Sequence, residues 1–273
     1  MADGVLKGQV AIVTGGAGLI GSAISRRFAA EGATAVINGR DQAKADALAE
    51  ELVQQGYKAY VHIANIRDEA EVTRMVEWTV SDFGRVDILI NNAGGVGNTG
   101  GGKAAYIRDM TLENWTSVLD LNLTAAFLCS RAVFPHMAAR TYGRVIGISS
   151  AGYFGIIGLA NYAAAKSGLI AFSKSLALEG APFGITSNVV APHLVDSARG
   201  AERPADITAT LLAQVPIKRF GTPAEIAASV LHLASLEAGY ITGEVPHVKG
   251  GMEWLGPDID MAAGLRKPSQ QSY

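Results

Sequence analysis

The sequence predicts an α/β fold in which helices cover both faces of one parallel sheet, the doubly wound arrangement. Short β-branched apolar runs alternate along the chain with longer amphipathic or alanine-rich runs, as in repeated β-α-β units. The runs at 10–13 and 88–90 are apolar throughout, which is typical of strands buried on both faces. No internal repeat or linker divides the 273 residues, so we expect one domain over residues 1–254 and a C-terminal tail over 255–273.

The individual elements follow from this alternation. We expect seven parallel strands, because successive β-α-β units with right-handed crossovers build a single parallel sheet. Two long interruptions, 94–102 and 192–220, are expected to form loops on the ligand side, the second with at most a short helix. The expected strands are residues 10–14, 34–38, 58–63, 86–91, 144–149, 186–190 and 245–248. The expected helices are residues 18–31, 42–55, 69–83, 111–139, 161–179 and 223–236.

Composition excludes several classes of protein. A net charge of −2 and a pI near 6.2 give no general attraction to nucleic acid or to an anionic membrane. The single cysteine, Cys129, excludes an internal disulfide framework, and the scattered histidines show no metal-ligand spacing. No apolar run reaches the roughly 18 residues of a spanning helix, and the N-terminus lacks a signal-peptide pattern. We expect a cytoplasmic protein without a metal.

A glycine motif lies between the first expected strand and the first expected helix. Gly16, Gly18 and Gly21 match the G-x-G-x-x-G fingerprint in its required strand-turn-helix context. There the glycines allow the backbone to approach a pyrophosphate at the helix N-terminus. The motif predicts a Rossmann-type dinucleotide site, with cofactor contacts at Gly15, Gly18, Leu19 and Ile20.

The end of the second expected strand bears on which dinucleotide binds. It reads Asn38-Gly39-Arg40-Asp41, and a carboxylate here favours NAD while a guanidinium suits the 2′-phosphate of NADP. Asp41 competes for the first role, but it directly precedes a helical run, where aspartate is a natural N-cap. Gly39 and Arg40 therefore favour NADP(H) over NAD(H).

A tyrosine and a lysine, Tyr162 and Lys166, are spaced i and i+4 on one expected helix and so share its face. A nearby cation favours the phenolate, which makes tyrosine a competent general acid/base. Other polar residues accompany the pair: two serines, Ser149 and Ser150, end a strand, and Asn122 interrupts an apolar helix. A tyrosine and a lysine at this spacing are common by chance, so the order of all these motifs along the chain is stronger evidence for function than the pair alone.

Over residues 5–252 the chain resembles the short-chain dehydrogenase/reductase family. The motifs occur in the family's order: the glycine motif, Asn91-Asn92-Ala93-Gly94, Asn122, a strand-end serine, Tyr-x-x-x-Lys, and the segment after Pro192. The resemblance implies catalytic roles for Asn122, Ser149, Tyr162 and Lys166. It also implies cofactor contacts along the remaining motifs, at Gly39, Arg40, Asn65, Ile66, Asn92, Ala93, Gly94, Tyr162, Lys166, Pro192, His193 and Val195.

The implied roles are specific. Tyr162 exchanges a proton with the substrate oxygen, and Lys166 lowers the pKa of Tyr162 and holds the nicotinamide ribose. Ser149 orients the carbonyl; it is preferred to Ser150 because it lies thirteen residues before Tyr162, as is usual in the family. Asn122 supports a proton relay through water to Lys166.

Three positions depart from the family pattern. Leu19 stands where most related members have glycine, Asn65 where they have aspartate, and His193 where a glycine follows the proline. An asparagine carbonyl can still accept a hydrogen bond from adenine. The imidazole of His193 either shapes the substrate pocket or is merely tolerated on its loop.

The resulting hypothesis is an NADP(H)-dependent carbonyl reductase or alcohol dehydrogenase acting on a small-molecule ketone or secondary alcohol. The alternatives are an NAD-dependent alcohol or diol dehydrogenase and a catalytically silent nucleotide-binding regulator. The resemblance implies a homotetramer or homodimer, and we expect neither nucleic acid nor membrane as a partner.

Overall fold

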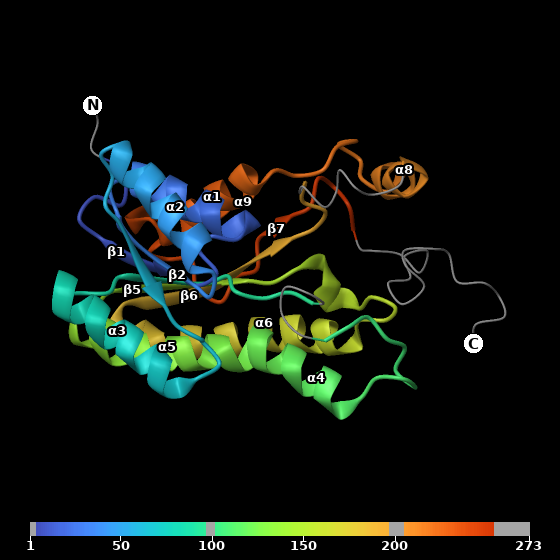
Figure 1. The fold of residues 1–273 in the computed structure, drawn as a ribbon, viewed down its shortest axis with the longest axis horizontal. Helices are drawn as coiled ribbons and strands as arrows, with labels where there is room; N and C mark the ends of the chain where they lie inside the picture. Colours follow the sequence, from blue (N-terminus) through green and yellow to red (C-terminus); the bar gives the residue numbers. More distant parts are fainter. Residues whose placement is uncertain (1–3, 97–101, 197–204, 254–273) are drawn as a thin grey trace.

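The computed structural model describes residues 4–96, 102–196 and 205–253, and within them seven parallel strands form one sheet (Figure 1). The strand order is β3-β2-β1-β4-β5-β6-β7, so the order reverses between β1 and β4. This confirms the predicted seven-stranded, doubly wound, Rossmann-type fold. The strands are β1 Val10–Val13, β2 Thr34–Gly39, β3 Ala59–Ile63, β4 Ile88–Asn91, β5 Gly143–Ile148, β6 Ile185–Pro192 and β7 His247–Val248. The tail predicted at 255–273 lies outside the described residues.

Helices cover both faces of the sheet (Figure 1). One core layer packs Ile24 and Phe28 of α1 and Ile226 of α9 against the sheet, and all three are fully buried. The opposite layer packs Met75 of α3 and Val133 of α5 against it. The helices are α1 Leu19–Ala30, α2 Gln42–Gln54, α3 Glu69–Phe83, α4 Leu112–Leu119, α5 Ala125–Ala139, α6 Ala160–Gly180, α8 Ala205–Ala213 and α9 Pro223–Ala234.

The helix expected over 111–139 is present as one helical segment, Leu112–Ala139, but its middle is not regular α-helix, which the sequence did not predict. A five-residue π-helix, Asp120–Thr124, separates α4 from α5 and contains Asn122. The carboxamide of Asn122 donates to the carbonyl oxygen of Val118 one turn back, at 2.9 Å, and so competes with the regular helical bonds. Single π-turns inside helices occur frequently at functional sites.

This long helical segment, Leu112–Ala139, is the one stretch of the described chain that is apolar and long enough to cross a membrane. Half of its apolar window is buried within the protein, where α5 packs beside α3 and α6. Its apolar character is therefore accounted for by the core of this fold.

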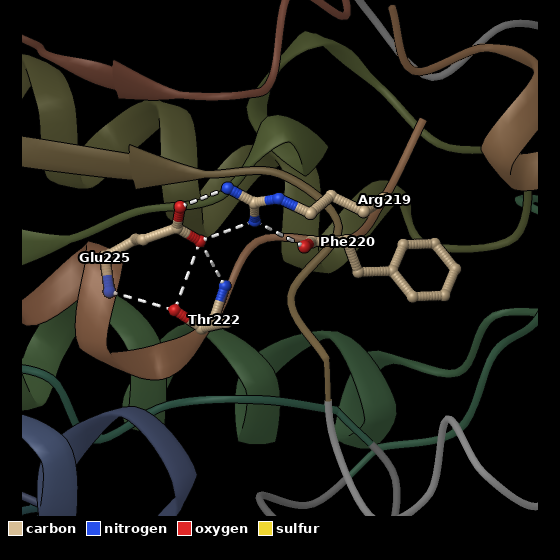
Figure 2. A network of polar contacts seen from close by, with 4 residues as sticks. All are labelled: Arg219, Phe220, Thr222 and Glu225. Carbon is tan, nitrogen blue, oxygen red and sulfur yellow. Dashed lines mark hydrogen bonds and ion pairs between the residues drawn. The ribbon is translucent and has the colours of Figure 1, made fainter. Parts of the chain in front are cut away.

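The segment 192–220 contains the short helix α8, as predicted. Hydrogen bonds hold the two ends of this segment together. Val195 and Gly221 form a bridge, and the Gly221 N–H donates to the Leu194 carbonyl oxygen at 2.9 Å. Figure 2 shows the adjoining network, in which Arg219 donates to both carboxylate oxygens of Glu225 at 2.9 and 2.6 Å. Glu225 also accepts from the Thr222 N–H at 2.7 Å, completing a capping box for α9. This network fixes the end of the segment on α9.

Candidate active site

The carboxyl ends of β1 and β4 are joined at the point where the strand order reverses. The Thr14 hydroxyl donates to the Ile90 carbonyl at 3.0 Å and accepts from the N–H groups of Asn92 and Ala93. The Asn92 side chain donates in turn to the Thr14 and Gly15 carbonyls at 2.9 and 3.1 Å. Ligands of open α/β sheets bind in the crevice at such a switch point, so a ligand site is expected at this edge of the sheet.

The turn after β1 requires its glycines. Gly15 has a φ of +60°, a left-handed conformation that favours glycine. A Cβ on Gly21 would lie 2.1 Å from the Gly15 carbonyl oxygen and 2.7 Å from Asn92 Nδ2. Leu19, the departure from the family pattern, begins α1 and is 48% exposed, so its side chain is not packed into the turn. The backbone thus remains open to a ligand at the start of α1.

A cavity of about 620 Å³ runs along this edge of the sheet. Its walls are formed by residues at the ends of β1, β2, β3, β4 and β5 and by residues of α6. Most of the predicted site residues line it, namely Gly15, Gly18, Leu19, Ile20, Gly39, Arg40, Asn65, Ile66, Asn92, Ala93, Gly94, Ser149, Tyr162 and Lys166. Asn122, Pro192, His193 and Val195 do not line it.

One end of the cavity is rich in cations. Arg40, Lys44 and Arg67 all contribute to its wall, and sequence reasoning found only the first. Asp41 accepts a hydrogen bond from the Lys44 N–H at 3.2 Å, which confirms it as the N-cap of α2, and pairs with the Lys44 ammonium at 2.8 Å. Asn65 Oδ1 accepts from the Arg67 N–H at 3.3 Å. The N–H and the ammonium group of Lys44 therefore offset the negative charge of Asp41.

Tyr162 and Lys166 lie on one face of α6, as predicted from their spacing. The Lys166 ammonium is buried, lies 5.6 Å from the centre of the Tyr162 ring and donates to the Ile148 carbonyl oxygen at 2.8 Å. Burial lowers the pKa of Lys166 to about 8, because the charged form loses hydration. Burial also raises the pKa of Tyr162, so the phenol is protonated at neutral pH.

The structure turns the two adjacent serines in different directions. The Ser149 hydroxyl donates to the Lys166 carbonyl oxygen at 3.1 Å, and the residue is 4% exposed. The Ser150 hydroxyl instead accepts from the Gly152 N–H at 3.1 Å and lies beside the Tyr162 phenol, where it acts to lower the pKa of that tyrosine against the larger effect of burial. In this structure Ser150 lies beside the phenol and Ser149 faces α6, while the catalytic role of Ser149 stays a prediction. Ser149 continues the ladder of β5 through its N–H to Val190, and its neighbour therefore points the other way.

Asn122 binds the loop after β4 through Gly95 and holds that loop close to Lys166. Its carboxamide accepts from the Gly95 N–H at 2.9 Å and donates to the Gly95 carbonyl at 3.0 Å. A Cβ on Gly94 would lie 2.6 Å from Asn122 Oδ1 and 2.9 Å from Lys166 Nζ. These three motifs, distant in sequence, therefore meet at one point of the cavity wall.

Known proteins resemble this chain over nearly its whole length. Residues 15–253 match the profile of the family described as Enoyl-(Acyl carrier protein) reductase. The 3-oxoacyl-[acyl-carrier-protein] reductase FabG of Escherichia coli (strain K12) is 42% identical over 247 residues, which are 90% of this chain and 98% of that protein. The chain belongs to the short-chain dehydrogenase/reductase family. It is accordingly an oxidoreductase of CH–OH and C=O groups that uses a nicotinamide cofactor.

Other relatives of this short-chain dehydrogenase/reductase differ in their named activities. The (2S)-[(R)-hydroxy(phenyl)methyl]succinyl-CoA dehydrogenase subunit BbsD of Thauera aromatica is 36% identical over 246 residues, which are 90% of this chain and 97% of that protein. The crystal structure of gox2181 superimposes with a TM-score of 0.83 at 32% identity, covering 90% of this chain and 96% of that one. The solved relative thus shares the fold, and the relatives whose names state an activity state different ones.

In this short-chain dehydrogenase/reductase the residues after β6 lie outside the main cavity. The His193 N–H donates to the Val248 carbonyl oxygen at 3.1 Å, and Pro192 pairs with Val248 in the β6-β7 register. Val195 forms the bridge to Gly221 at the base of the segment 192–220. Pro192, His193 and Val195 thus lie against β7 and the base of the segment 192–220.

Proposed function

We propose that this chain is an NADP(H)-dependent carbonyl reductase that interconverts a ketone and a secondary alcohol. The observation that carries the proposal is the position of Tyr162 on the wall of the cavity, with its ring centre 5.6 Å from the buried Lys166 ammonium. Burial raises the pKa of this phenol. A phenol kept protonated at neutral pH is ready to give a proton to a carbonyl oxygen.

The residues of the chain have these roles in the reduction. Tyr162 donates its proton to the substrate oxygen as general acid. Ser150 donates a hydrogen bond to the same oxygen and holds it beside the phenol, the role that the sequence had given to Ser149. The positive charge of Lys166 stabilises the phenolate left on Tyr162. Asn122 keeps the loop at Gly95 in place, so that the wall of the cavity is preformed.

The described residues fit a dinucleotide. The φ of +60° at Gly15 favours glycine, and a Cβ on Gly94 would clash with Asn122, so neither position carries a side chain that could fill the cavity. The start of α1 offers N–H groups and a positive dipole end to a pyrophosphate. When bound, the nicotinamide supplies or accepts the hydride. A regulator that binds nucleotide without catalysis would have no need for the buried ammonium of Lys166, whose burial is unfavourable.

Cations at the adenosine end support NADP(H) over NAD(H). Arg40, Lys44 and Arg67 line the cavity there, whereas Asp41 caps α2 and is paired with Lys44. A 2′-phosphate gains charge-assisted hydrogen bonds from such a cluster, and a lone ribose hydroxyl gains much less.

The experiment is a comparison of kcat/KM with NADPH and NADH for wild type and Arg40→Gln on one ketone. We expect wild type to prefer NADPH, and Arg40→Gln to lose about tenfold with NADPH while changing little with NADH. A wild-type preference for NADH would overturn the cofactor assignment, and absence of turnover with either cofactor on a panel of carbonyl compounds would favour the regulator.

A second candidate is the oxidative direction, as an alcohol or diol dehydrogenase using NAD. The likeness to BbsD, which is named a dehydrogenase, favours it. In that direction Tyr162 must act as a base, and the raised pKa of the phenol then requires alkaline conditions. Measuring alcohol oxidation with NAD and NADP from neutral to alkaline pH distinguishes the two.

Exposed apolar side chains on α4, α5 and α6 support a homodimer or homotetramer. Leu112, Phe127 and Leu178 are 76%, 41% and 79% exposed. Large apolar side chains gathered on neighbouring helices are typical of a subunit interface. Light scattering coupled to size-exclusion chromatography tests this, and a monomer at micromolar concentration would contradict it.

A further inference from the structure

His193 follows Pro192 at the end of β6, at a position where the family pattern has glycine. Its N–H donates to the Val248 carbonyl at 3.1 Å, so its backbone is fixed between β6 and β7. Both nitrogens of its ring are buried, and neither has a hydrogen-bond partner among the described residues. A buried polar group without a partner is destabilising and is commonly satisfied by an ordered water, a ligand or an ion. The imidazole therefore has hydrogen-bonding capacity that the described chain does not use.

The ring of His247 lies next to this imidazole and connects it to two further rings, those of Tyr153 and Phe154. The His247 ring lies 6.2 Å from that of His193, and His247 Nε2 lies 2.7 Å from the hydroxyl oxygen of Tyr153. The Tyr153 ring stacks on Phe154 with centroids 4.1 Å apart. We call His193, His247, Tyr153 and Phe154 the aromatic wall.

The aromatic wall adjoins the catalytic groups. Tyr153 and Phe154 lie in the 3-10 helix Ala151–Phe154, which begins directly after Ser150. The Tyr153 carbonyl accepts from the Ser167 hydroxyl of α6 at 2.8 Å. A Cβ on Gly152 would lie 3.0 Å from the Tyr162 ring, so this turn packs directly on the phenol. The turn that carries Tyr153 and Phe154 is therefore in contact with the catalytic phenol.

His193 is uncharged at neutral pH. Burial lowers its pKa to about 4, and the neighbouring His247 and Lys249 act in the same direction while Glu253 acts against them. Lys249 and Glu253 pair with each other at 3.3 Å. A neutral imidazole offers one N–H donor and one acceptor, which suits a neutral oxygen such as an ester or thioester carbonyl.

We propose that His193 determines substrate specificity by donating a hydrogen bond to a second, neutral carbonyl oxygen of the substrate. The preferred substrates are then ketones that carry an ester or thioester carbonyl close to the reacting one. This inference rests on the proposed carbonyl reduction and narrows its substrate class. The names of two relatives, 3-oxoacyl-[acyl-carrier-protein] reductase and (2S)-[(R)-hydroxy(phenyl)methyl]succinyl-CoA dehydrogenase, agree with such a substrate.

The test uses two ketones of equal chain length, ethyl 3-oxobutanoate and heptan-2-one, of which only the first has the second carbonyl. His193→Leu removes the hydrogen bond and keeps the bulk, whereas His193→Gln keeps an N–H donor. His232→Leu, at an exposed histidine of α9, is the matched control. NADPH-dependent kcat/KM is measured for all four proteins on both ketones, and thermal unfolding checks that each variant is folded.

We expect His193→Leu to lose about tenfold in kcat/KM on the keto ester and to change less than about twofold on heptan-2-one. His193→Gln should recover most of the loss, and His232→Leu should match wild type. Equal losses on both ketones would indicate a merely structural role and would overturn the inference, as would no loss on either. If wild type reduces neither ketone, the proposed function itself fails, which is a distinct result.

Discussion

The Lys166 ammonium donates its hydrogen bond to the carbonyl oxygen of Ile148, 2.8 Å away at the end of β5. The same ammonium lies 5.6 Å from the centre of the Tyr162 ring. A strand end thus holds the cation beside the phenol before any ligand binds. Because the side chain is buried, both the charge of Lys166 and its distance from Tyr162 have consequences that can be measured.

The pH dependence of reduction is the first consequence. Burial lowers the pKa of Lys166 to about 8, so the cation is present below that pH and is lost above it. Since the cation stabilises the phenolate that forms on Tyr162, kcat/KM for ketone reduction should fall as pH rises through about 8. A pH profile of kcat/KM for wild type and Lys166→Arg checks this, because any residual activity of the arginine variant should lack that fall. A wild-type profile that stays flat to about pH 10 would contradict the assignment.

The stability of the free enzyme is the second consequence. The pKa of Lys166 is lower in the folded chain than its ordinary value of 10.5, so the buried charge destabilises the fold at neutral pH. This cost is complete below about pH 8 and disappears as pH rises toward the unfolded pKa. Lys166→Met should therefore be inactive but more stable by about 2 kcal/mol at pH 7, as measured by urea unfolding. A less stable Lys166→Met variant would show that the Ile148 hydrogen bond outweighs desolvation.

The two serines give a direct comparison. Ser150→Ala removes the hydroxyl that meets the Tyr162 phenol, and we expect kcat to fall by about a hundredfold or more. Ser149→Ala removes only the hydrogen bond to the Lys166 carbonyl, so we expect at most about a fivefold change. The measurement is kcat on one ketone with NADPH. The reverse ranking of the two variants would restore the assignment made from the sequence.

Gly94 tests how tightly the cavity wall is built. An added Cβ would lie 2.6 Å from Asn122 Oδ1, closer than real contacts allow, so Gly94→Ala should destabilise the protein by about 1–3 kcal/mol. A Cβ on Gly39 would meet nothing within 4 Å, so Gly39→Ala is the control and should unfold at nearly the wild-type temperature. Equal melting temperatures for the two variants would show that the wall yields easily.

The fold was predictable because its signals are local. Continuous apolar runs such as 88–90 marked the buried strands, and the aspartate before a helical run, Asp41, proved to be its N-cap. The π-turn around Asn122 was missed because one extra residue per turn does not interrupt an apolar helical pattern. Only the unexpected polar residue at 122 hinted at it.

The sequence predicted most of the residues that line the cavity, but it did not predict the directions in which the side chains of Ser149 and Ser150 point. Counting thirteen residues back from Tyr162 selected Ser149, but the direction of a strand-end side chain depends on pairing with the neighbouring strand. Ser149 pairs with β6, and this contact between distant segments left Ser150 beside the phenol. Lys44 and Arg67 were missed for the same reason, because only the folded chain brings them to one wall of the cavity.

The most direct test of Tyr162 as the general acid is the rate of NADPH oxidation by wild type and Tyr162→Phe with ethyl 3-oxobutanoate. Phenylalanine removes only the hydroxyl, so NADPH should still bind within about threefold of wild type by fluorescence titration. We expect kcat to fall by about a thousandfold, the contribution of a positioned general acid. A Tyr162→Phe variant that retains near-wild-type kcat would contradict the proposed chemistry.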